Sequence, residues 1–287
     1  MKKKEEKYYT VGNSPFVYAG YQCNNRCVFC FEAERFFPHK TKEQIKKEIR
    51  IIRKRFDFIN FMGQEPTLRD DIVELIGSAK KRGFKEVGIT TNGRLFAYPD
   101  FAERIIRSGL TQIVLTVAGS DAPTHDKHTL SKGSFKQALA GIKNILNYKP
   151  ADFSLVINIM ATNKNYRKIP KMVKFYADLG IKEINIGHVL PLNKKIVRSK
   201  EIVAKMSEVA PFLIDCHKKY GQEIRFLFVE YPACVFPEEY RQLSFPCLEE
   251  NPQKKRIAFC RKCPYRDKCF GINKDYLNLY GEKEFKI

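Results

Sequence analysis

From residue 16 to about residue 195, short β-rich segments alternate with longer amphipathic ones. Six runs rich in Val, Ile, Phe and Thr are expected to be strands, at 16–21, 58–62, 86–91, 112–118, 153–161 and 182–187. Between them, apolar residues recur at the three-to-four spacing of helices in the segments 42–55, 70–82, 100–108, 134–148 and 169–179. This order predicts βα units around a parallel sheet, closed either as a doubly wound sheet or as a barrel.

Three cysteines, Cys23, Cys27 and Cys30, lie on the loop after the first expected strand. Reactive side chains of both fold types lie on loops at the carboxyl ends of strands. Three thiolates within eight residues bind one face of a cubane iron-sulfur cluster and leave one iron without a protein ligand. A structural zinc ion needs a fourth ligand, for which His39 is the near candidate, so zinc and chance spacing are the less favoured alternatives.

A second motif, Gly63-Gln64-Glu65, follows the second expected strand. A backbone carbonyl of such a turn and the carboxylate of Glu65 are both suitable acceptors for an ammonium group. The motif alone is also typical of an ordinary turn between a strand and a helix. Its position one βα unit after the cysteine loop favours a binding role.

The two motifs together resemble the radical S-adenosylmethionine (SAM) superfamily. That family has a C-x3-C-x2-C loop after its first strand, with an aromatic residue, here Phe29, before the last cysteine. Its GGE motif is similar to residues 63–65, with Gln64 in place of the middle glycine. The resemblance implies a 4Fe-4S cluster whose open iron binds the amino and carboxylate groups of SAM. An electron from the cluster then breaks the C5'-S bond, and a 5'-deoxyadenosyl radical takes a hydrogen atom from the substrate.

The resemblance also implies which side chains contact the cofactor. The implied contacts follow or lie within the first five expected strands, where the family places its SAM pocket. Each implied residue after the turn at 63–65 is equally compatible with a structural role. The implied cofactor-binding residues are Phe29, Gly63, Gln64, Glu65, Thr91, Thr116 and Asn158. No side chain stands out as a catalytic acid or base.

The C-terminal segment is rich in cysteine. Cys260, Cys263 and Cys269 have C-x2-C-x5-C spacing, and Cys234 and Cys247 precede them. This pattern resembles the auxiliary-cluster modules called SPASM and Twitch, which implies a second 4Fe-4S cluster with four cysteine ligands. Cys234 is the preferred fourth ligand because it follows a strand-like run at 223–231, and Cys247 is the alternate. A zinc ribbon is less favoured, because the segment has one C-x2-C pair and no histidine.

These features predict an α/β protein with a partial (β/α)6 TIM-type barrel at residues 12–195. A small cysteine-rich auxiliary-cluster module follows at 196–287, beginning with a helix at 200–219. The first residues contain no apolar run, so we expect no signal peptide or membrane span and a cytoplasmic location. Cys216 stands apart from both cysteine groups and is expected to be a buried free thiol.

The expected function is that of a radical SAM enzyme of the maturase type, which abstracts hydrogen from a peptide or protein side chain. It would receive electrons from an external donor of the ferredoxin or flavodoxin type. Lys and Arg exceed Asp and Glu by 52 to 32, a formal charge of +20, so a nucleic-acid-modifying enzyme is the first alternative. The second alternative is a non-catalytic iron-sulfur electron carrier or scaffold, which would not need the turn at 63–65.

Overall fold

The computed structural model describes residues 15–30, 39–190, 200–245, 253–269 and 271–286. The chain forms two compact units. The first unit comprises the described parts of Met1–Arg26, Arg35–Thr116 and Ser131–Val156. The second comprises those of Cys27–Glu34, Val117–Leu130 and Ile157–Ile287.

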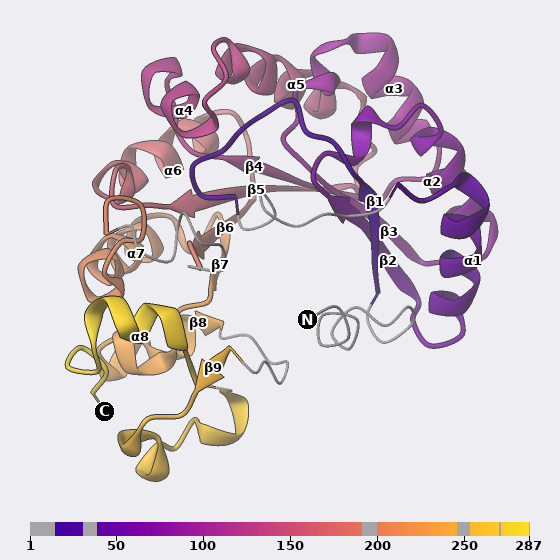
Figure 1. The fold of residues 1–287 in the computed structure, drawn as a ribbon. Helices are drawn as coiled ribbons and strands as arrows, with labels where there is room; N and C mark the ends of the chain where they lie inside the picture. Colours follow the sequence, from indigo (N-terminus) through magenta and orange to yellow (C-terminus); the bar gives the residue numbers. More distant parts are fainter. Residues whose placement is uncertain (1–14, 31–38, 191–199, 246–252, 270, 287) are drawn as a thin grey trace. The chain divides into compact units, whose positions relative to one another are not determined.

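The first unit contains a parallel sheet covered by helices. Its strands are β1 (Phe16–Gly20), β2 (Phe58–Gly63), β3 (Glu86–Thr91) and most of β4 (Gln112–Val117), and each pairs in parallel with the next. Helices α1 (Lys42–Arg53), α2 (Ile72–Lys81) and α3 (Pro99–Arg107) cover one face of these strands, and α5 (Ser134–Tyr148) packs against α3 (Figure 1).

The two faces of these strands differ in chemistry. In β4, Ile113 and Leu115 are fully buried, whereas the alternate residues Val114 and Thr116 are half-buried. Successive side chains of a strand point to opposite faces, so the half-buried residues share the face that the helices leave uncovered. Asn60 of β2 donates a hydrogen bond to Thr90 of β3 at 2.9 Å. This face therefore presents polar groups beside the carboxyl ends of the strands.

The second unit continues the alternation. It contains the end of β4, α4 (Ala122–Thr129), most of β5 (Ser154–Ala161), α6 (Ile169–Asp178), β6 (Glu183–His188), α7 (Met206–Tyr220), β7 (Arg225–Val229) and β8 (Ser244–Phe245). Strands β6, β7 and β8 pair in parallel. The order β1 to β8 is that of one eight-stranded sheet. The short strands β9 (Lys254–Lys255) and β10 (Ile272–Asn273) pair antiparallel and lead into α8 (Lys274–Tyr280).

The predicted fold class is confirmed: the strands of a partial TIM-type barrel alternate with helices, and a cysteine-rich region follows. The six expected strands and five expected helices are present, with ends that shift by a few residues. The sheet is longer than six strands, because β7 and β8 extend it. The helix expected at 200–219 begins at Met206, after an extended residue at Lys205. No described helix is long and apolar enough to cross a membrane.

A helix in the loop after β4 was not predicted. Its N-terminus is capped by Asp121, whose carboxylate accepts the backbone N–H of Thr124 at 2.8 Å, and Pro123 lies in its first turn. Both are standard helix-start signals. The segment was missed because its polar sequence lacks the apolar periodicity by which the other helices are identified.

Candidate functional site

The carboxylate of Glu65 joins the ends of β2 and β3 in the first unit. Glu65 is 1% exposed. Its Oε1 accepts hydrogen bonds from the hydroxyl and backbone N–H of Thr67 at 2.6 and 3.1 Å and from the hydroxyl of Thr91 at 2.7 Å. Its Oε2 accepts the backbone N–H of Asn92 at 2.7 Å. Burial raises the pKa of Glu65, and these four donors oppose the rise.

Two glycines let the backbones of β1 and β2 approach closely at this point. Gly63 has a φ of +118°, and a Cβ there would lie 2.6 Å from the carbonyl oxygen of Gly20. A Cβ on Gly20 would lie 2.8 Å from the nitrogen of Glu65. The close approach brings the N–H of Glu65 to the carbonyl of Gln22 at 2.9 Å. The turn at 63–65 is therefore fixed against the start of the cysteine loop.

Replacing Gly63 with alanine is expected to lower the free energy of unfolding by about 2 kcal/mol, because the new Cβ adds left-handed strain and a backbone clash. For a chain of this size the midpoint of thermal unfolding falls by roughly 4–8 °C. Gly77→Ala is the matched control, because a Cβ there meets its nearest atom at 3.5 Å within helix α2. Differential scanning calorimetry of both variants tests this; equal midpoints would show that the approach of β1 and β2 tolerates a Cβ.

The loop that carries Cys23 is held by two residues that follow β3. Asn92 donates its Nδ2–H to Oδ1 of Asn24 at 2.6 Å and lies 3.8 Å from Sγ of Cys23. The guanidinium of Arg94 donates to the carbonyl of Asn24 and to Oδ1 of Asn25 at 2.9 Å. The N–H of Asn25 donates to the Cys23 sulfur at 3.4 Å. Hydrogen bonds of this kind stabilise negative charge on a thiolate.

Sequence reasoning missed Arg94. The resemblance implied a role for Thr91 of the third strand only, and an arginine shortly after a strand is common on protein surfaces. The sequence does place Arg94 on the loop after the third strand, and the cysteine loop follows the first strand, so both loops are expected at the same end of a parallel sheet. Its partners became visible only with the tertiary structure.

Cys27 and Cys30 belong to the second unit, and both are partly accessible. The N–H of Cys30 bonds to the carbonyl of Cys27 at 3.1 Å, and the N–H of Val28 bonds to the carbonyl of His128 at 2.8 Å. Phe29 is 8% exposed. The aromatic side chain therefore anchors the turn in the core, while the two thiols stay within reach of a ligand.

The remaining predicted cofactor contacts lie in different settings. Thr91 is buried and donates to Glu65, so it supports the turn at 63–65. Thr116 is half-buried on the face of β4 that the helices leave uncovered. Asn158 of β5 is half-buried and donates to the sulfur of Met160 at 3.6 Å. The direct contact of these three side chains with a cofactor stays a prediction.

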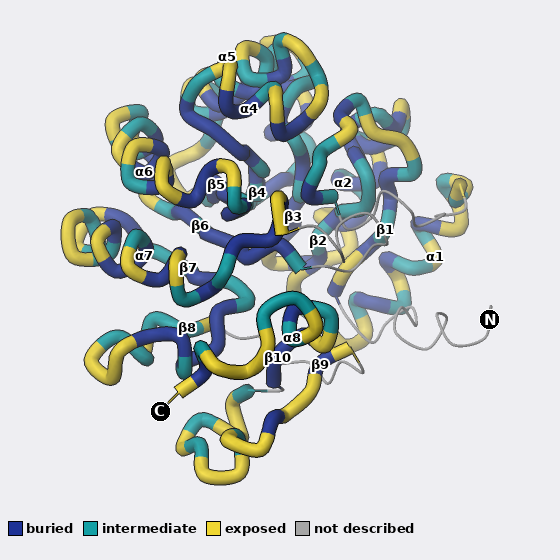
Figure 2. Tube along the Cα trace, turned by 60° about the vertical axis from the view of Figure 1, so that its left-hand side comes forward, coloured by how far each residue is buried: buried dark blue, intermediate teal, exposed yellow. Residues whose placement is uncertain are grey.

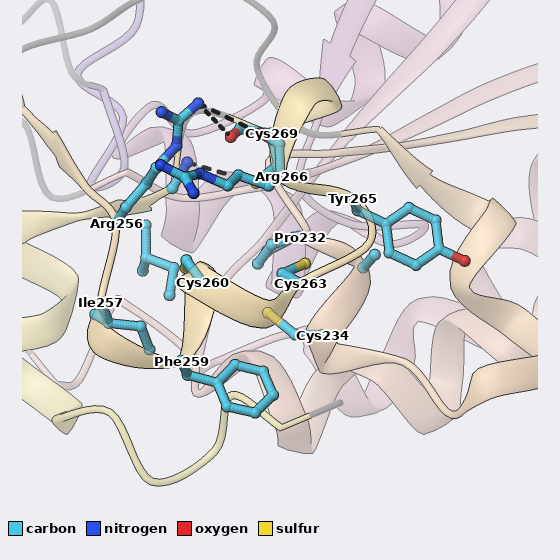
Figure 3. Close-up of a pocket in the computed structure, with 13 residues that line it drawn as sticks. Pro232, Cys234, Arg256, Ile257, Phe259, Cys260, Cys263, Tyr265, Arg266 and Cys269 are labelled. Atoms are coloured by element: carbon cyan, nitrogen blue, oxygen red, sulfur yellow. Dashed lines mark hydrogen bonds between the residues drawn. The ribbon is translucent and has the colours of Figure 1, made fainter.

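Four cysteines of the second unit line one pocket. Cys234 lies in the short helix η4 (Ala233–Val235), Cys260 in η6 (Ala258–Lys262), and Cys263 and Cys269 flank η7 (Arg266–Lys268). Figure 3 shows Cys234, Cys260 and Cys263 around this pocket. All four are partly accessible. Cys247 lies outside the described residues.

Burial and neighbouring charges both change the pKa values of the thiols in this pocket. Burial raises the pKa of Cys234 to about 12, and charge on Cys269, Cys260 and Cys263 acts in the same direction. Burial also raises the pKa of Cys269, while the N–H of Gly271, 3.4 Å from its sulfur, and the cation of Lys254 lower it. The four thiols line one pocket, so negative charge on one of them disfavours charge on its neighbours.

The donor set of the pocket fits an iron-sulfur cluster, because four cysteine thiolates are the usual ligands of a 4Fe-4S centre. Metal binding deprotonates such thiols despite their raised pKa values. Among the described residues, no three His, Cys, Asp or Glu side chains already adopt a metal-binding arrangement. The cysteines thus share a pocket without converging to ligand distances.

Two further residues have structural surroundings. His188, at the end of β6, is 2% exposed, and its Nε2 bonds to the carbonyl of Ala204 at 2.9 Å. Burial lowers the pKa of His188 to about 4, so the ring is neutral at physiological pH. Cys216 is 1% exposed within α7, which confirms its prediction as a buried thiol.

Comparison with known proteins identifies one family. Residues 17–176 match the family model described as the Radical SAM superfamily. The "Probable GTP 3',8-cyclase" of Saccharolobus islandicus (strain L.S.2.15 / Lassen #1) is 28% identical over 185 residues, which cover 62% of this chain and 58% of the relative. The "AdoMet-dependent heme synthase" of Nitratidesulfovibrio vulgaris is 25% identical over 235 residues, covering 80% and 61%. The chain thus spans less than two thirds of the length of either relative.

Solved structures with similar folds include two that hold peptides. SuiB of Streptococcus suis bound to SAM has a TM-score of 0.69 at 16% identity, over 99% of this chain and 80% of that one. SuiB bound to the precursor peptide SuiA gives 0.58 at 20% identity, over 77% and 50%. Native anSMEcpe with AdoMet (SAM) and the Cp18Cys peptide gives 0.60 at 18% identity, over 74% and 62%. At these identities the similarity concerns the fold.

Proposed function

The chain belongs to the radical SAM superfamily, and on this premise we propose that it is a maturase-type enzyme that modifies a side chain of a peptide or protein. The observation that carries the proposal is the pocket lined by four cysteines in the second unit. A second cluster of this kind characterises the SPASM and Twitch modules, which the C-terminal cysteine pattern resembles. The fold similarity to SuiB and anSMEcpe, both solved with peptides, supports the same substrate class.

The proposed SAM site lies at the cysteine loop. Cys23, Cys27 and Cys30 would hold the first 4Fe-4S cluster, whose open iron is the place for SAM. When bound, the two cofactors supply reductive cleavage of SAM and abstraction of a hydrogen atom from the substrate. The residues of the chain bind and orient these groups.

Within this site, we assign Glu65 a positioning role. Both its oxygens already accept hydrogen bonds from Thr67, Thr91 and Asn92, four in all. The carboxylate therefore fixes the turn at 63–65, and the backbone carbonyls of that turn are the proposed acceptors for the ammonium group of SAM. Gln64 replaces the family's middle glycine without interrupting the backbone, since its N–H still bonds to the carbonyl of Gly20 at 3.4 Å.

At the second site, Cys234, Cys260, Cys263 and Cys269 would hold an auxiliary 4Fe-4S cluster. Such a cluster would take up the electron that remains on the substrate after hydrogen abstraction. We further propose a cytoplasmic enzyme that receives its electrons from a ferredoxin- or flavodoxin-type donor.

The test is anaerobic reconstitution followed by chemical reduction in the presence of SAM. We expect 5'-deoxyadenosine in the product mixture and about eight irons per chain, four for each cluster. Cys27→Ser is the control that removes the first site, and it should form no 5'-deoxyadenosine. Wild-type protein that yields none would contradict the proposed chemistry.

The substrate class is tested in the same assay. We expect SAM cleavage to leave GTP unchanged and to modify a peptide, detected by mass spectrometry after incubation with synthetic peptides that match any short open reading frames beside the gene. Conversion of GTP would instead favour the activity for which the first curated relative is named.

A further inference from the structure

The segment from the end of β9 to the loop before β10 is rich in positive charge, and two of its arginines, Arg256 and Arg266, line the four-cysteine pocket. We define the basic loop as residues 255–268. It carries six exposed cations, the side chains of Lys255, Arg256, Arg261, Lys262, Arg266 and Lys268. We propose that the basic loop is the docking surface for a small acidic redox protein, which exchanges electrons with the group held by the four cysteines. The inference rests on the auxiliary cluster of the proposed function.

The charge of the loop is strongly one-sided. Asp267 is its one acidic residue, which leaves a formal excess of +5 over fourteen residues. On α1, by contrast, cations and acids are interleaved: Lys46 lies 3.7 Å from Glu43 and 2.8 Å from Glu74. In the basic loop, Lys255 lies 3.8 Å from Glu282. A concentrated positive surface attracts an acidic partner, orients it before contact and raises the association rate.

One arginine of the loop, Arg256, also has a structural role. Arg256 donates to the backbone carbonyls of Arg266 and Cys269, both at 3.3 Å, and these contacts are drawn in Figure 3. They hold the two ends of the loop together. Arg261 and Lys262, by contrast, are exposed on the short helix η6, directly between Cys260 and Cys263. These two cations are therefore the ones to change in a test.

The surface has the features of an electron-transfer contact. Phe259 is 36% exposed and lines the cysteine pocket, and Pro264 beside Cys263 is exposed as well. Most of the loop is at the surface (Figure 2). A small apolar centre with a charged rim is typical of a protein contact, and transient redox complexes bury little area. A partner on this surface would lie next to thiols that are themselves partly accessible.

This placement favours a redox protein over a nucleic acid. A phosphate backbone would need positive charge along a track, with aromatic side chains on which bases stack. Here six cations are concentrated within fourteen residues beside a proposed electron carrier. The step itself would be a one-electron transfer: the auxiliary cluster, after taking up the electron from the substrate, would lose one electron to the oxidised partner, with no bond formed or broken.

The experiment uses the reconstituted full chain with an acidic flavodoxin as the probe. Calorimetry measures docking, and EPR after rapid mixing measures the rate at which oxidised flavodoxin takes one electron from the auxiliary cluster, which is first reduced with dithionite and freed of the excess. In Arg261→Glu/Lys262→Glu we expect association at low ionic strength to slow by about tenfold or more. The difference should vanish at high salt, where the charges are screened. Reduction by excess dithionite should reach the same extent as in the wild type.

The matched control is Lys47→Glu/Arg50→Glu, which reverses one exposed lysine and one exposed arginine on α1. We expect wild-type association from it. Equal association rates for the η6 variant and the wild type would overturn the inference. Displacement of flavodoxin by a short single-stranded RNA, with RNA binding lost in the same η6 variant, would also overturn it in favour of a nucleic-acid surface. An iron content near four per chain would instead refute the auxiliary cluster itself.

Discussion

Glu65→Ala is expected to lower the midpoint of thermal unfolding by about 6–20 °C and to abolish SAM cleavage. The substitution leaves four buried donors, on Thr67, Thr91 and Asn92, without their acceptor. Loss of a buried, fully hydrogen-bonded carboxylate costs about 3–5 kcal/mol of unfolding free energy. In a chain of this size each kcal/mol corresponds to roughly 2–4 °C. The same loss releases the turn at 63–65, which is why activity should fall with stability.

Two further variants separate these effects. Glu65→Gln keeps the shape of the side chain and one oxygen acceptor, but it places an amide N–H against another hydrogen-bond donor. Its midpoint of thermal unfolding should therefore lie between those of the wild type and of Glu65→Ala. Glu74→Ala removes a surface carboxylate that pairs with Lys42 and Lys46, and should change the midpoint little, because exposed ion pairs contribute little. If Glu65→Ala unfolds at the same temperature as Glu74→Ala, the carboxylate of Glu65 does not fix the turn at 63–65 as we propose.

The part of this site that could be predicted from sequence is the part encoded in local spacing. Cys23, Cys27 and Cys30 lie within one loop, and Gly63 and Glu65 within one turn, so short motifs identify them. The strands and helices are also encoded locally, in the period of their apolar residues. These features place both motifs after the carboxyl ends of neighbouring strands before any coordinates are known.

The contacts that fix the site could not be predicted in this way. The bonds from Asn92 and Arg94 to Asn24 join residues about seventy positions apart, and they depend on the register of β1 against β3 through β2. Likewise, the four hydrogen bonds that Glu65 accepts from Thr67, Thr91 and Asn92 depend on how the loops after β2 and β3 meet, and its contact with the cofactor stays a prediction. No single-sequence pattern encodes such pairings, because many surface arginines and asparagines have the same local context.

The short elements of the tail show the same limit. Strands of two residues, such as β8 (Ser244–Phe245), have no period to detect. The C-terminal helix α8 begins at a cap in which Asn273 accepts the N–H groups of Asp275 and Tyr276. Its position is fixed by the hydroxyl of Tyr276, which bonds to the N–H of Met206 at 2.7 Å and to Glu284 at 2.6 Å. Tertiary contacts, more than local propensity, determine these elements.

The choice of the fourth auxiliary ligand leads to the second large effect. Cys234→Ser is expected to reduce the iron content from about eight to about four per chain, because a 4Fe-4S cluster with four protein ligands loses stability without one of them. Cys234 lines the same pocket as Cys260, Cys263 and Cys269. Burial, followed by negative charge on these three neighbours, raises the pKa of its thiol. SAM cleavage at the first site should continue in this variant, while turnover of the substrate should stop.

Cys247→Ser is the matched control, because Cys247 is the alternate ligand and the substitution is chemically identical. We expect it to keep about eight irons and the EPR signals of both reduced clusters. Iron analysis and EPR of the two variants, reconstituted side by side, decide between the two cysteines. If Cys247→Ser loses the second cluster and Cys234→Ser keeps it, then Cys234 lines the pocket without being a ligand of the cluster. The auxiliary cluster would then depend on a residue thirteen positions further along the chain, beyond β8.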